Sequence, residues 1–434
     1  MTFNRPLKFL AALVTVVGIS SILSVAVTTK NFSESYPAVV CPPTLDGLGS
    51  QISLSSKKTP FQRLQNRTTK TVPVKVLRLP VNKDSLVISS EGATPVVWQS
   101  RQGSWAGGAL CTGPASSQWF VGGAADVTTR GRLIIVNSGL SDAVVDVESF
   151  TENGKQPLRT LNVVSKNYIV IPLDSLAPGD KTLTVHVAPR SGRINAFMID
   201  EQGKGLKALG GDLVNPATTA RKNVVIPAIP NQNSRNTPAL PHTLRILSPG
   251  DVDANVTVEV MSGDGVFVPV GFTSRSISAG IVTEFALDPN ITSNVMAVRI
   301  TASEPVVAAV KSTVVASGRK DFVWSTAAPE LTPLTIAVTG LTPFVSFAGE
   351  RINVSLDVTL VNGKVVRQNV KGTDIANWRV PANARSFTLI KVGEATYAGA
   401  LVSSVNGYGY FPIAAGSVLT KIEVPDSNIR VLNP

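Results

Sequence analysis

Apolar and polar residues alternate along three separate stretches of the chain, at residues 145–148, 256–260 and 354–360. Each stretch runs into a turn-forming pair, and these pairs are Asn153-Gly154, Asp264-Gly265 and Asn362-Gly363. Side chains point alternately to the two faces of a strand, so this spacing predicts strands with one buried face and one solvent face. Asn-Gly and Asp-Gly pairs supply the positive φ angles of a tight β-hairpin. The glycines stand 111 and 98 residues apart (265−154 and 363−265), which predicts three tandem β-sandwiches.

Composition supports an all-β fold. Charged residues make up 16% of the 434 residues, against the usual ~25% of soluble domains, and many of the remaining residues are Val, Thr, Ser, Gly and Pro. We expect tandem immunoglobulin-like β-sandwich domains at residues 72–235, with extra N-terminal strands, and at 236–331 and 332–434. A propeller-like closed array is the rival architecture. Three repeats of this length fit it less well than four or more blades of about 40–45 residues would.

The N-terminal segment carries a membrane signal. Arg5 and Lys8 precede an uncharged, largely apolar run at residues 9–29. A helix of that length can cross a bilayer core of about 30 Å, and the positive leading side favours a cytoplasmic N-terminus. We therefore expect residues 1–29 to form a single-pass transmembrane helix in the cytoplasmic membrane, with the bulk of the chain extracytoplasmic. The alternative is a signal peptide cleaved after Ser24-Val25-Ala26, and both interpretations export the chain.

Positive charge is concentrated near the N-terminus. Residues 1–83 contain eleven Lys and Arg and two acidic residues, a net +9 of the formal +11. We expect residues 30–71 to form a basic extracytoplasmic stalk that contacts anionic lipid or phosphate-rich wall polymer, with a solvated linker as the alternative. Nucleic acid is not an expected partner, because Phe61 is the one aromatic residue between Ser50 and Lys83, where the basic residues cluster. The basic residues are Lys57, Lys58, Arg63, Arg67, Lys70, Lys75, Arg78 and Lys83.

The chain contains two cysteines, Cys41 and Cys111. An even number of cysteines in an exported protein favours a disulfide. A metal site is the alternative, but two thiols with His186 and His242 far away in the sequence make a poor ligand set.

No catalytic, cofactor-binding or metal-binding residue is predicted. A Gly-x-Ser-x-Gly motif is absent, and the Ser-x-x-Lys sequence at residues 55–58 lacks a Lys-Thr-Gly partner. His186 and His242 have no motif context, and zinc spacings, EF-hand loops and nucleotide-binding motifs are also absent.

Aromatic residues are the remaining candidates for binding. Exposed tryptophans stack on sugar faces, whereas buried ones fill sandwich cores beside a disulfide. We favour the core for the tryptophans and keep both roles open. The candidates are Trp98, Trp105, Trp119, Tyr408 and Tyr410.

Several short sequences carry a family resemblance. They are Cys41-Pro42-Pro43, LCTGP at residues 110–114, QWFVGG at 118–123 and LIIVNSG at 133–139, followed by the first alternating stretch. Together they resemble an uncharacterised family of single-anchor, exported β-sandwich envelope proteins of high-GC Gram-positive bacteria. The resemblance covers most of the chain and implies a fold and a location, and no catalytic residue is carried over from it.

We expect a non-catalytic, membrane-anchored envelope protein that acts as scaffold, spacer or binding module. Its expected partners are cell-wall polymer or other envelope proteins, with the membrane contacted through the N-terminal helix. An extracytoplasmic enzyme that processes cell wall or glycan, or an accessory subunit of one, is the alternative.

Overall fold

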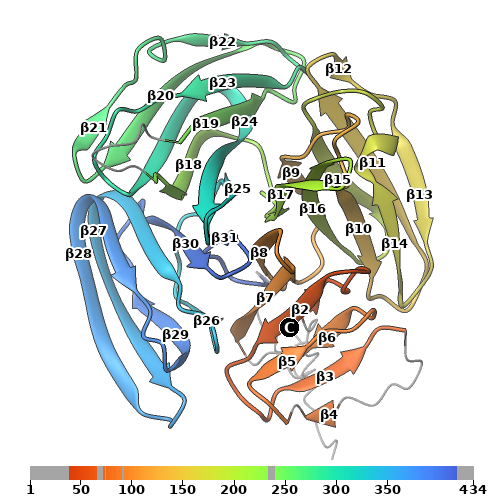
Figure 1. Ribbon diagram of the computed structural model, residues 1–434, viewed down its shortest axis with the longest axis vertical. Coiled ribbons are helices and arrows are strands. Elements are labelled where there is room, and N and C mark those ends of the chain that lie inside the picture. Colours follow the sequence, from red (N-terminus) through yellow and green to blue (C-terminus); the bar gives the residue numbers. More distant parts are fainter. Residues whose placement is uncertain (1–38, 66–71, 74, 90–91, 233–239, 418–434) are drawn as a thin grey trace, which may run out of the picture. The chain divides into compact units, whose positions relative to one another are not determined.

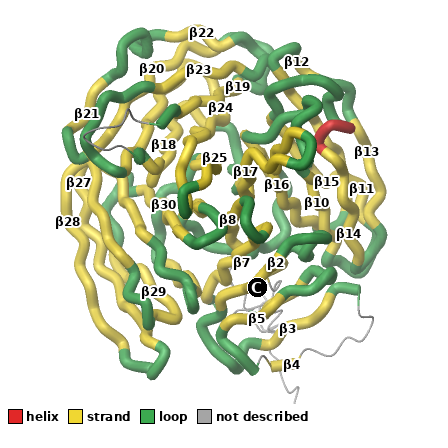
Figure 2. Tube along the Cα trace, viewed as in Figure 1, coloured by secondary structure: helices red, strands yellow, loops and turns green. Residues whose placement is uncertain are grey.

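The fold is all-β, with one short 3₁₀-helix, η1 (Leu173–Ser175), among the described residues. The computed structural model describes residues 39–65, 72–73, 75–89, 92–232 and 240–417, and these belong to one compact unit. Figures 1 and 2 show strands joined by short loops throughout this unit. No helix in these ranges is long and apolar enough to cross a membrane, and the expected anchor at residues 1–29 lies outside them.

Five sheets are formed by the described strands. The first has the order β1 (Val39–Cys41), β6 (Leu86–Ile88), β3 (Pro60–Arg63) and β4 (Val72–Pro73). The second has the order β14 (Asn167–Pro172), β10 (Arg132–Asn137), β16 (Ile194–Lys204) and β17 (Lys207–Val214). The third has the order β12 (Gly154–Lys155), β11 (Ala143–Thr151), β15 (Thr184–Ser191) and β9 (Gln118–Val121), with β13 (Arg159–Val163) beside β11.

The remaining two sheets are larger. One contains β18 (Arg221–Pro230), β19 (His242–Leu247), β20 (Ala254–Ser262), β21 (Gly265–Phe267), β22 (Arg275–Ile277), β23 (Thr283–Leu287), β24 (Val295–Ala316) and β25 (Arg319–Thr326). The other contains β2 (Gly49–Ser53), β5 (Arg78–Pro80), β7 (Ala93–Arg101), β8 (Trp105–Leu110), β26 (Leu334–Ala337), β27 (Phe344–Leu360), β28 (Val365–Arg379), β29 (Ala384–Lys391), β30 (Tyr397–Ser403) and β31 (Tyr408–Pro412).

The three predicted hairpins are present. Gly154, Gly265 and Gly363 have φ angles of 103°, 114° and 90°, which only glycine adopts readily. Gly154 and Gly265 are the first residues of β12 and β21, which pair with β11 and β20, and Gly363 lies in the turn between the paired strands β27 and β28. Along β11 and β20 buried residues alternate with partly exposed or exposed ones, as the apolar spacing predicts.

Four strands meet at the centre of the unit, and each is the second strand of a hairpin. Strand β8 contacts β17 and β31, and β25 contacts the same two strands, so the four close a cycle. Each continues outward into three more strands, which gives the groups β8–β7–β2–β5, β17–β16–β10–β14, β25–β24–β19–β23 and β31–β30–β27–β28. We call these groups blades and name each by its central strand. Figure 1 shows them arranged around the four central strands.

Four-stranded groups around a central cycle are also a feature of the propeller-like array, the less favoured of the two architectures expected from the sequence. Three of the blades belong to the three sequence repeats. The fourth, the β8 blade, is built by the N-terminal region, which has no Asn-Gly or Asp-Gly hairpin of its own. The repeat count therefore missed one blade, because each repeat was recognised by a hairpin turn, and the N-terminal Asp46-Gly47 pair lies between β1 and β2, which belong to different sheets.

Three of the central strands, β8, β17 and β25, lead into the next part of the fold. After β8 the chain enters β9, which pairs with β15, and after β17 it enters β18, which pairs with β24. After β25 it enters β26, which pairs with β29 and, in parallel, with β7. The first predicted sandwich, residues 72–235, thus includes a strand, β18, that pairs within the second repeat. The long strand β24 also passes through both layers of its repeat, pairing with β20 and then with β19.

The expected stalk contains strands where it is described. Within residues 30–71 the chain forms β1, β2 and β3, and Ile52, Leu54 and Leu64 are at most 3% exposed. Residues 39–64 of the expected stalk therefore belong to the folded unit. The exposed Lys57 and Lys58 lie between β2 and β3, while short apolar runs on either side enter the core.

The predicted disulfide is confirmed. Cys41 at the end of β1 is bonded to Cys111 just after β8, and both residues are fully buried. They share a hydrophobic cluster with Trp105 and with Ile134 and Phe197 of the β17 blade. The disulfide therefore fixes the N-terminal strands against the centre of the unit.

Buried carboxylates join two of the central strands. Asp212 of β17 accepts the backbone N–H of Trp324 on β25 at 2.8 Å, and Asp321 of β25 accepts that of Gly211 on β17 at 3.0 Å. The Trp324 indole N–H donates to Asp200 at 2.8 Å. Asp200 and Asp212 are 0% exposed and Asp321 is 3% exposed. Side chains thus supply the hydrogen bonds between two strands that are not paired in one sheet.

Candidate functional site

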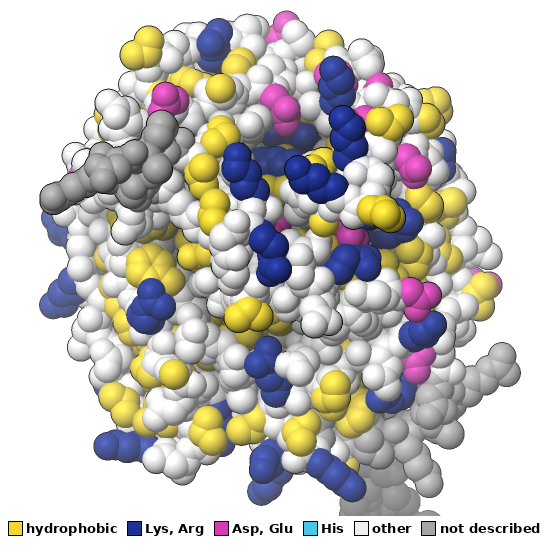
Figure 3. All heavy atoms as spheres, viewed as in Figure 1, with side chains coloured by type: hydrophobic (Ala, Val, Ile, Leu, Met, Phe, Trp, Pro, Cys, Tyr) yellow, Lys and Arg dark blue, Asp and Glu magenta, His cyan; other side chains and the backbone are white. Residues whose placement is uncertain are grey.

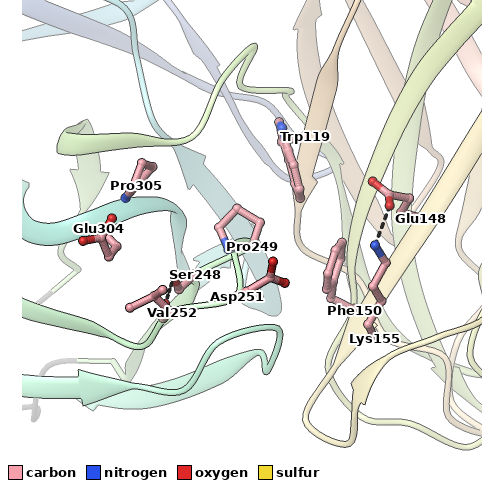
Figure 4. A pocket seen from close by; sticks show the side chains of 11 residues that line it. Trp119, Glu148, Phe150, Lys155, Ser248, Pro249, Asp251, Val252, Glu304 and Pro305 are labelled. Atoms are coloured by element: carbon pink, nitrogen blue, oxygen red, sulfur yellow. Dashed lines mark hydrogen bonds and ion pairs between the residues drawn. The ribbon is translucent and has the colours of Figure 1, made fainter.

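A cleft of about 450 Å³ lies where the first and second repeats meet, and we call it the Trp119 cleft. Its two walls come from segments far apart in the sequence. Figure 4 shows Trp119, Glu148, Phe150 and Lys155 on one side, facing the turn of residues 248–252 and the β24 residues 304–305 on the other. The lining residues are Trp119, Glu148, Phe150, Lys155, Ser248, Pro249, Gly250, Asp251, Val252, Glu304 and Pro305.

The first wall is aromatic with a charged rim. The rings of Trp119 and Phe150 lie 5.8 Å apart, and Lys155 lies over the Phe150 ring at 5.3 Å. Lys155 also forms an ion pair with Glu148 at 2.6 Å. Burial acts to raise the pKa of Glu148, but hydrogen bonds from Lys155 and then His186 outweigh it and hold the pKa below its usual value.

The second wall is a turn between β19 and β20. Ser248 donates its hydroxyl hydrogen bond to the Val252 carbonyl at 3.2 Å, which closes the Ser248-Pro249-Gly250 turn. Asp251 and Val252 on this turn are exposed, and Pro305 lies beside them. The cleft therefore combines apolar walls with carboxylates and an ammonium group, a mixture found in sites for small polar ligands.

Beside this cleft, Ser117, His186 and Glu148 form a hydrogen-bonded chain. The Ser117 hydroxyl lies 2.9 Å from His186 Nε2, and His186 Nδ1 lies 2.8 Å from a Glu148 carboxylate oxygen. The imidazole stacks on the Trp119 ring at 4.0 Å between centroids. These contacts follow from register, because His186 is directly opposite Glu148 on β11 and Trp119 on β9. This hydrogen-bonded series of serine, histidine and carboxylate has the same order as the catalytic triad of serine hydrolases.

The second repeat shows what the Glu148–His186 pair does structurally. At the corresponding position Glu259 of β20 is opposite Arg299 of β24, and the two form an ion pair at 2.6 Å. Arginine cannot act as a general base near neutral pH, since its pKa exceeds about 12. The position therefore carries a cross-strand hydrogen-bonded pair with a glutamate in both repeats, and the partner is histidine in the first repeat and arginine in the second.

A second cleft, of about 460 Å³, lies between the N-terminal region and the β17 blade. We call it the arginine cleft. Arg101 reaches Glu201 with two hydrogen bonds, at 2.6 and 3.0 Å, and the Glu201 side chain is 7% exposed. The lining residues are Leu45, Asp46, Leu48, Arg101, Arg130, Arg132, Val170, Ile199 and Glu201.

The candidate binding aromatics are mostly in the core. Trp105 and Tyr410 are 0% exposed, and Trp98 and Trp119 are 8% exposed. The core interpretation therefore holds for their location, and stacking of a ligand on Trp98, Trp105 or Tyr410 is not supported. Trp119 is the member of this group that lines a described cleft, and Tyr408 is only partly exposed.

The predicted basic residues are spread over the N-terminal region. Arg63 is partly exposed on β3, Arg78 of β5 donates to the Gly340 carbonyl at 2.9 Å, and Lys83 forms an exposed ion pair with Asp46 at 2.8 Å. Lys57, Lys58 and Lys75 are exposed, and Arg67 and Lys70 lie outside the described residues. The arginine cleft, which sequence reasoning missed, uses Arg101, Arg130 and Arg132. Arg101 stands 29 residues before the Arg130-Gly131-Arg132 segment, so charge clustering along the chain could not reveal that they share a cleft.

Metal coordination has no candidate in the described ranges, where no group of three or more His, Cys, Asp and Glu side chains could hold an ion. His242, the other isolated histidine, is 2% exposed, and its ring nitrogens lie 2.9 Å from the Ser312 hydroxyl and 3.1 Å from the side-chain amide oxygen of Asn231. Desolvation by burial lowers its pKa to about 4. His242 is therefore a neutral core residue.

The fold and its clefts define an all-β protein of sandwich-like repeats with ligand-sized clefts at two junctions. Residues 87–371 match the family of unknown function DUF5719, and the chain belongs to that family. The sequence resemblance to an uncharacterised family is thereby supported at this level.

Other comparisons give weaker similarities. A Thermotoga maritima 1070 crystal structure has 14% identity and a TM-score of 0.21, covering 23% of this chain and 93% of that one. Trypsin-activated alpha-2-macroglobulin from Escherichia coli has 10% identity and a TM-score of 0.11, covering 88% of this chain and 30% of that one. No curated protein matches the sequence.

Proposed function

We propose that the protein is a non-catalytic, extracytoplasmic binding module, held at the cytoplasmic membrane by residues 1–29, whose Trp119 cleft takes up cell-wall glycan. A buried disulfide favours an oxidising compartment, and the N-terminal apolar run favours export. Three aligned hairpins support an origin from tandem immunoglobulin-like sandwiches. Other envelope proteins remain the alternative partners.

The observation that carries this proposal is the composition of the Trp119 cleft. Trp119, Pro249 and Pro305 line its walls and supply apolar surface suited to the C–H faces of sugars. Its rim presents the carboxylates of Asp251 and Glu304, which can accept hydrogen bonds from sugar hydroxyls. The cleft joins two repeats, a common position for ligand sites.

The test uses a variant that fills the cleft without disturbing the core. Gly250 lines the cleft, no atom lies within 4 Å of the position where its Cβ would be, and its φ is not positive. Gly250→Trp should therefore fold normally and block the cleft. Val270→Trp, at a fully exposed position of the same repeat outside the cleft, is the matched control.

The full-length chain is incubated with purified wall polymer and, separately, with detergent-solubilised membrane proteins. We expect polymer binding that survives ~0.5 M salt, because exposed electrostatic contacts are screened at that ionic strength. Gly250→Trp should lose this binding and Val270→Trp should keep it. Equal binding by both variants would reject the cleft as the site, and capture of one defined membrane protein in place of polymer would favour a scaffold.

A second candidate function, an extracytoplasmic hydrolase, is favoured by the Ser117–His186–Glu148 chain. Its distances match those needed for a histidine base to activate a serine. The Glu259–Arg299 pair at the corresponding position argues that the first-repeat pair is structural. Covalent labelling of Ser117 by a fluorophosphonate probe, abolished in both Ser117→Ala and His186→Ala, would favour the enzyme. Absence of Ser117 labelling in the wild-type protein would leave the binding module as the better description.

A further inference from the structure

We propose that the arginine cleft binds the phosphate group of a phosphate ester. This site is separate from the Trp119 cleft, and it can be tested without knowing whether the protein binds wall polymer. Three arginines and two acidic residues line the cleft. Asp46 is already paired with Lys83, so Glu201 is the one lining carboxylate left to balance the three guanidinium groups. The cleft therefore carries excess positive charge.

Glu201 has a positioning role in this site. Its side chain is 7% exposed and both of its carboxylate oxygens accept hydrogen bonds from Arg101. A bidentate pair of this kind holds a guanidinium in one plane. Arg101 also donates to the Gly47 carbonyl at 3.4 Å, so its orientation is fixed from two sides. Glu201 thus orients one wall of the cleft and compensates one of its three positive charges.

Arg130 and Arg132 supply the charge that is left over. Arg132 donates to the carbonyls of Arg130 and Gly131, at 3.0 and 2.8 Å, and Arg130 donates to the carbonyl of Gly205. Neither forms an ion pair with a carboxylate in the described part of the chain. A guanidinium has five N–H donors, so each retains donors for an anion. Carbonyl contacts hold these side chains in place without neutralising them.

Phosphate suits this arrangement for two reasons. Guanidinium groups recognise phosphate oxygens with paired, charge-assisted hydrogen bonds, and three arginines line this cleft. The cleft volume of about 460 Å³ exceeds what an inorganic phosphate ion needs, and part of its lining is apolar. The apolar residues are Leu45, Leu48, Val170 and Ile199. A phosphate ester would place its oxygens on the arginines and its carbon atoms against these side chains.

The surface around the middle of the unit agrees with this assignment. Figure 3 shows Lys and Arg side chains gathered around a central hollow, with few Asp and Glu side chains among them. The hairpin between β16 and β17, which Arg130 contacts through Gly205, adds the exposed Lys204 and Lys207. A positive field of this kind draws anions toward the cleft.

The proposal is tested by calorimetric titration of the full-length chain in neutral detergent with sn-glycerol 3-phosphate, and with glycerol as the uncharged control. We expect saturable binding of the phosphate ester and none of glycerol. Arg130→Ala combined with Arg132→Ala should weaken binding roughly tenfold or more, the effect of losing hydrogen bonds to a charged group. Thermal unfolding of the double variant, measured alongside, checks that it remains folded.

Arg159→Ala is the matched control for the double variant. Arg159 also donates to a backbone carbonyl, that of Ser175, but lies on β13 outside the cleft. Its substitution should leave binding unchanged. Arg132→Lys with Arg130 intact should recover part of the affinity, because charge returns without the planar pair of donors.

Two further arms identify the source of the ester. If phosphatidylglycerol, but not phosphatidylcholine, added as mixed micelles in the same detergent prevents glycerol 3-phosphate binding, the phosphate is a lipid headgroup. If neither prevents it, a soluble or polymer-linked ester is the ligand. The proposal is overturned if no saturable binding is seen at ~10 mM ester, or if the double variant binds as tightly as the Arg159→Ala control.

Discussion

The Asp321 carboxyl should make the stability of the unit fall as the pH rises from about 4 to about 7. Asp321 is buried between β25 and β17, and burial raises its pKa to about 7 from 3.8, against the opposing hydrogen bonds from the backbone N–H groups of Gly211 and Phe322. Between these two values the native protein holds a proton that the unfolded chain has lost. Stability therefore decreases with rising pH, and the contribution is fully present only below the unfolded pKa.

The size of the effect follows from the two pKa values. One pKa unit corresponds to 1.36 kcal/mol, so the interval from 3.8 to about 7 corresponds to about 4 kcal/mol at most. Asp212 adds an effect of the same sign. Its pKa is raised well above 3.8, chiefly by burial and further by the charge of Asp321, so removing that charge lessens the shift of Asp212 as well.

Asp321→Asn is the appropriate variant. An amide keeps an oxygen that can accept both N–H groups and places an NH₂ where the protonated acid has its hydroxyl, but it does not titrate. Urea unfolding of wild type and variant is compared from pH 4.5 to pH 8 under oxidising conditions, with equal m-values required. We expect the stability of the variant relative to wild type to rise with pH, by up to about 1.4 kcal/mol per unit.

Asp357→Asn is the control. Asp357 is hydrogen-bonded to Arg367, which lowers its pKa below 3.8, so its contribution changes only at lower pH. The difference between this variant and wild type should be constant over the measured range. A flat difference for Asp321→Asn as well would refute the argument, since it would mean that Asp321 is as ionised in the native protein as in the unfolded chain.

Three other predictions concern single contacts. Replacing both Cys41 and Cys111 by Ser should lower the free energy of unfolding by about 4 kcal/mol, because the disulfide closes a loop with a sequence separation of 70. Alkylation of the unreduced wild-type protein should find no free thiol. His242, with a pKa lowered to about 4, contributes stability that is lost as pH falls below about 6.5, so His242→Gln should flatten the acid side of the stability profile measured by thermal unfolding. Tyr410→Phe should cost about 1 kcal/mol in urea unfolding, because the Tyr410 hydroxyl donates to the buried Thr326 carbonyl at 2.8 Å, and an unchanged midpoint would show that this bond adds nothing.

Local patterns in the sequence predicted local structure well. The hairpins at Gly154, Gly265 and Gly363 depend on residues within a few positions of one another, so alternation and turn chemistry suffice to find them. The disulfide followed from counting cysteines. Strands β1 and β3 were missed because each is only three or four residues long and lies among Lys and Arg residues.

Sites assembled across blades could not be predicted in the same way. Glu148 and His186 each stand at outward positions of alternating strands, but the register that sets them opposite each other is a property of the folded sheet. The arginine cleft combines Arg101 with Arg130 and Arg132 only because the N-terminal region packs against the β17 blade. Sequence reasoning singled out His186 but none of the three arginines, and it could not find where residues from different blades meet.

The glycine-rich passage around Trp105 shows why the blades form one unit. Such a passage predicts a loop when it is considered alone, yet it forms the central strand β8. A Cβ on Gly107 would lie 2.6 Å from the backbone nitrogen of Leu213 on β17, and one on Gly409 of β31 would lie 2.7 Å from that of Gly108. No larger residue fits at these positions unless the strands separate, because glycine in a strand marks a close approach of two backbones. The absence of side chains at these glycines therefore allows the central strands to pack closely. The blades that carry the two clefts are held in contact by backbone packing as well as by side chains.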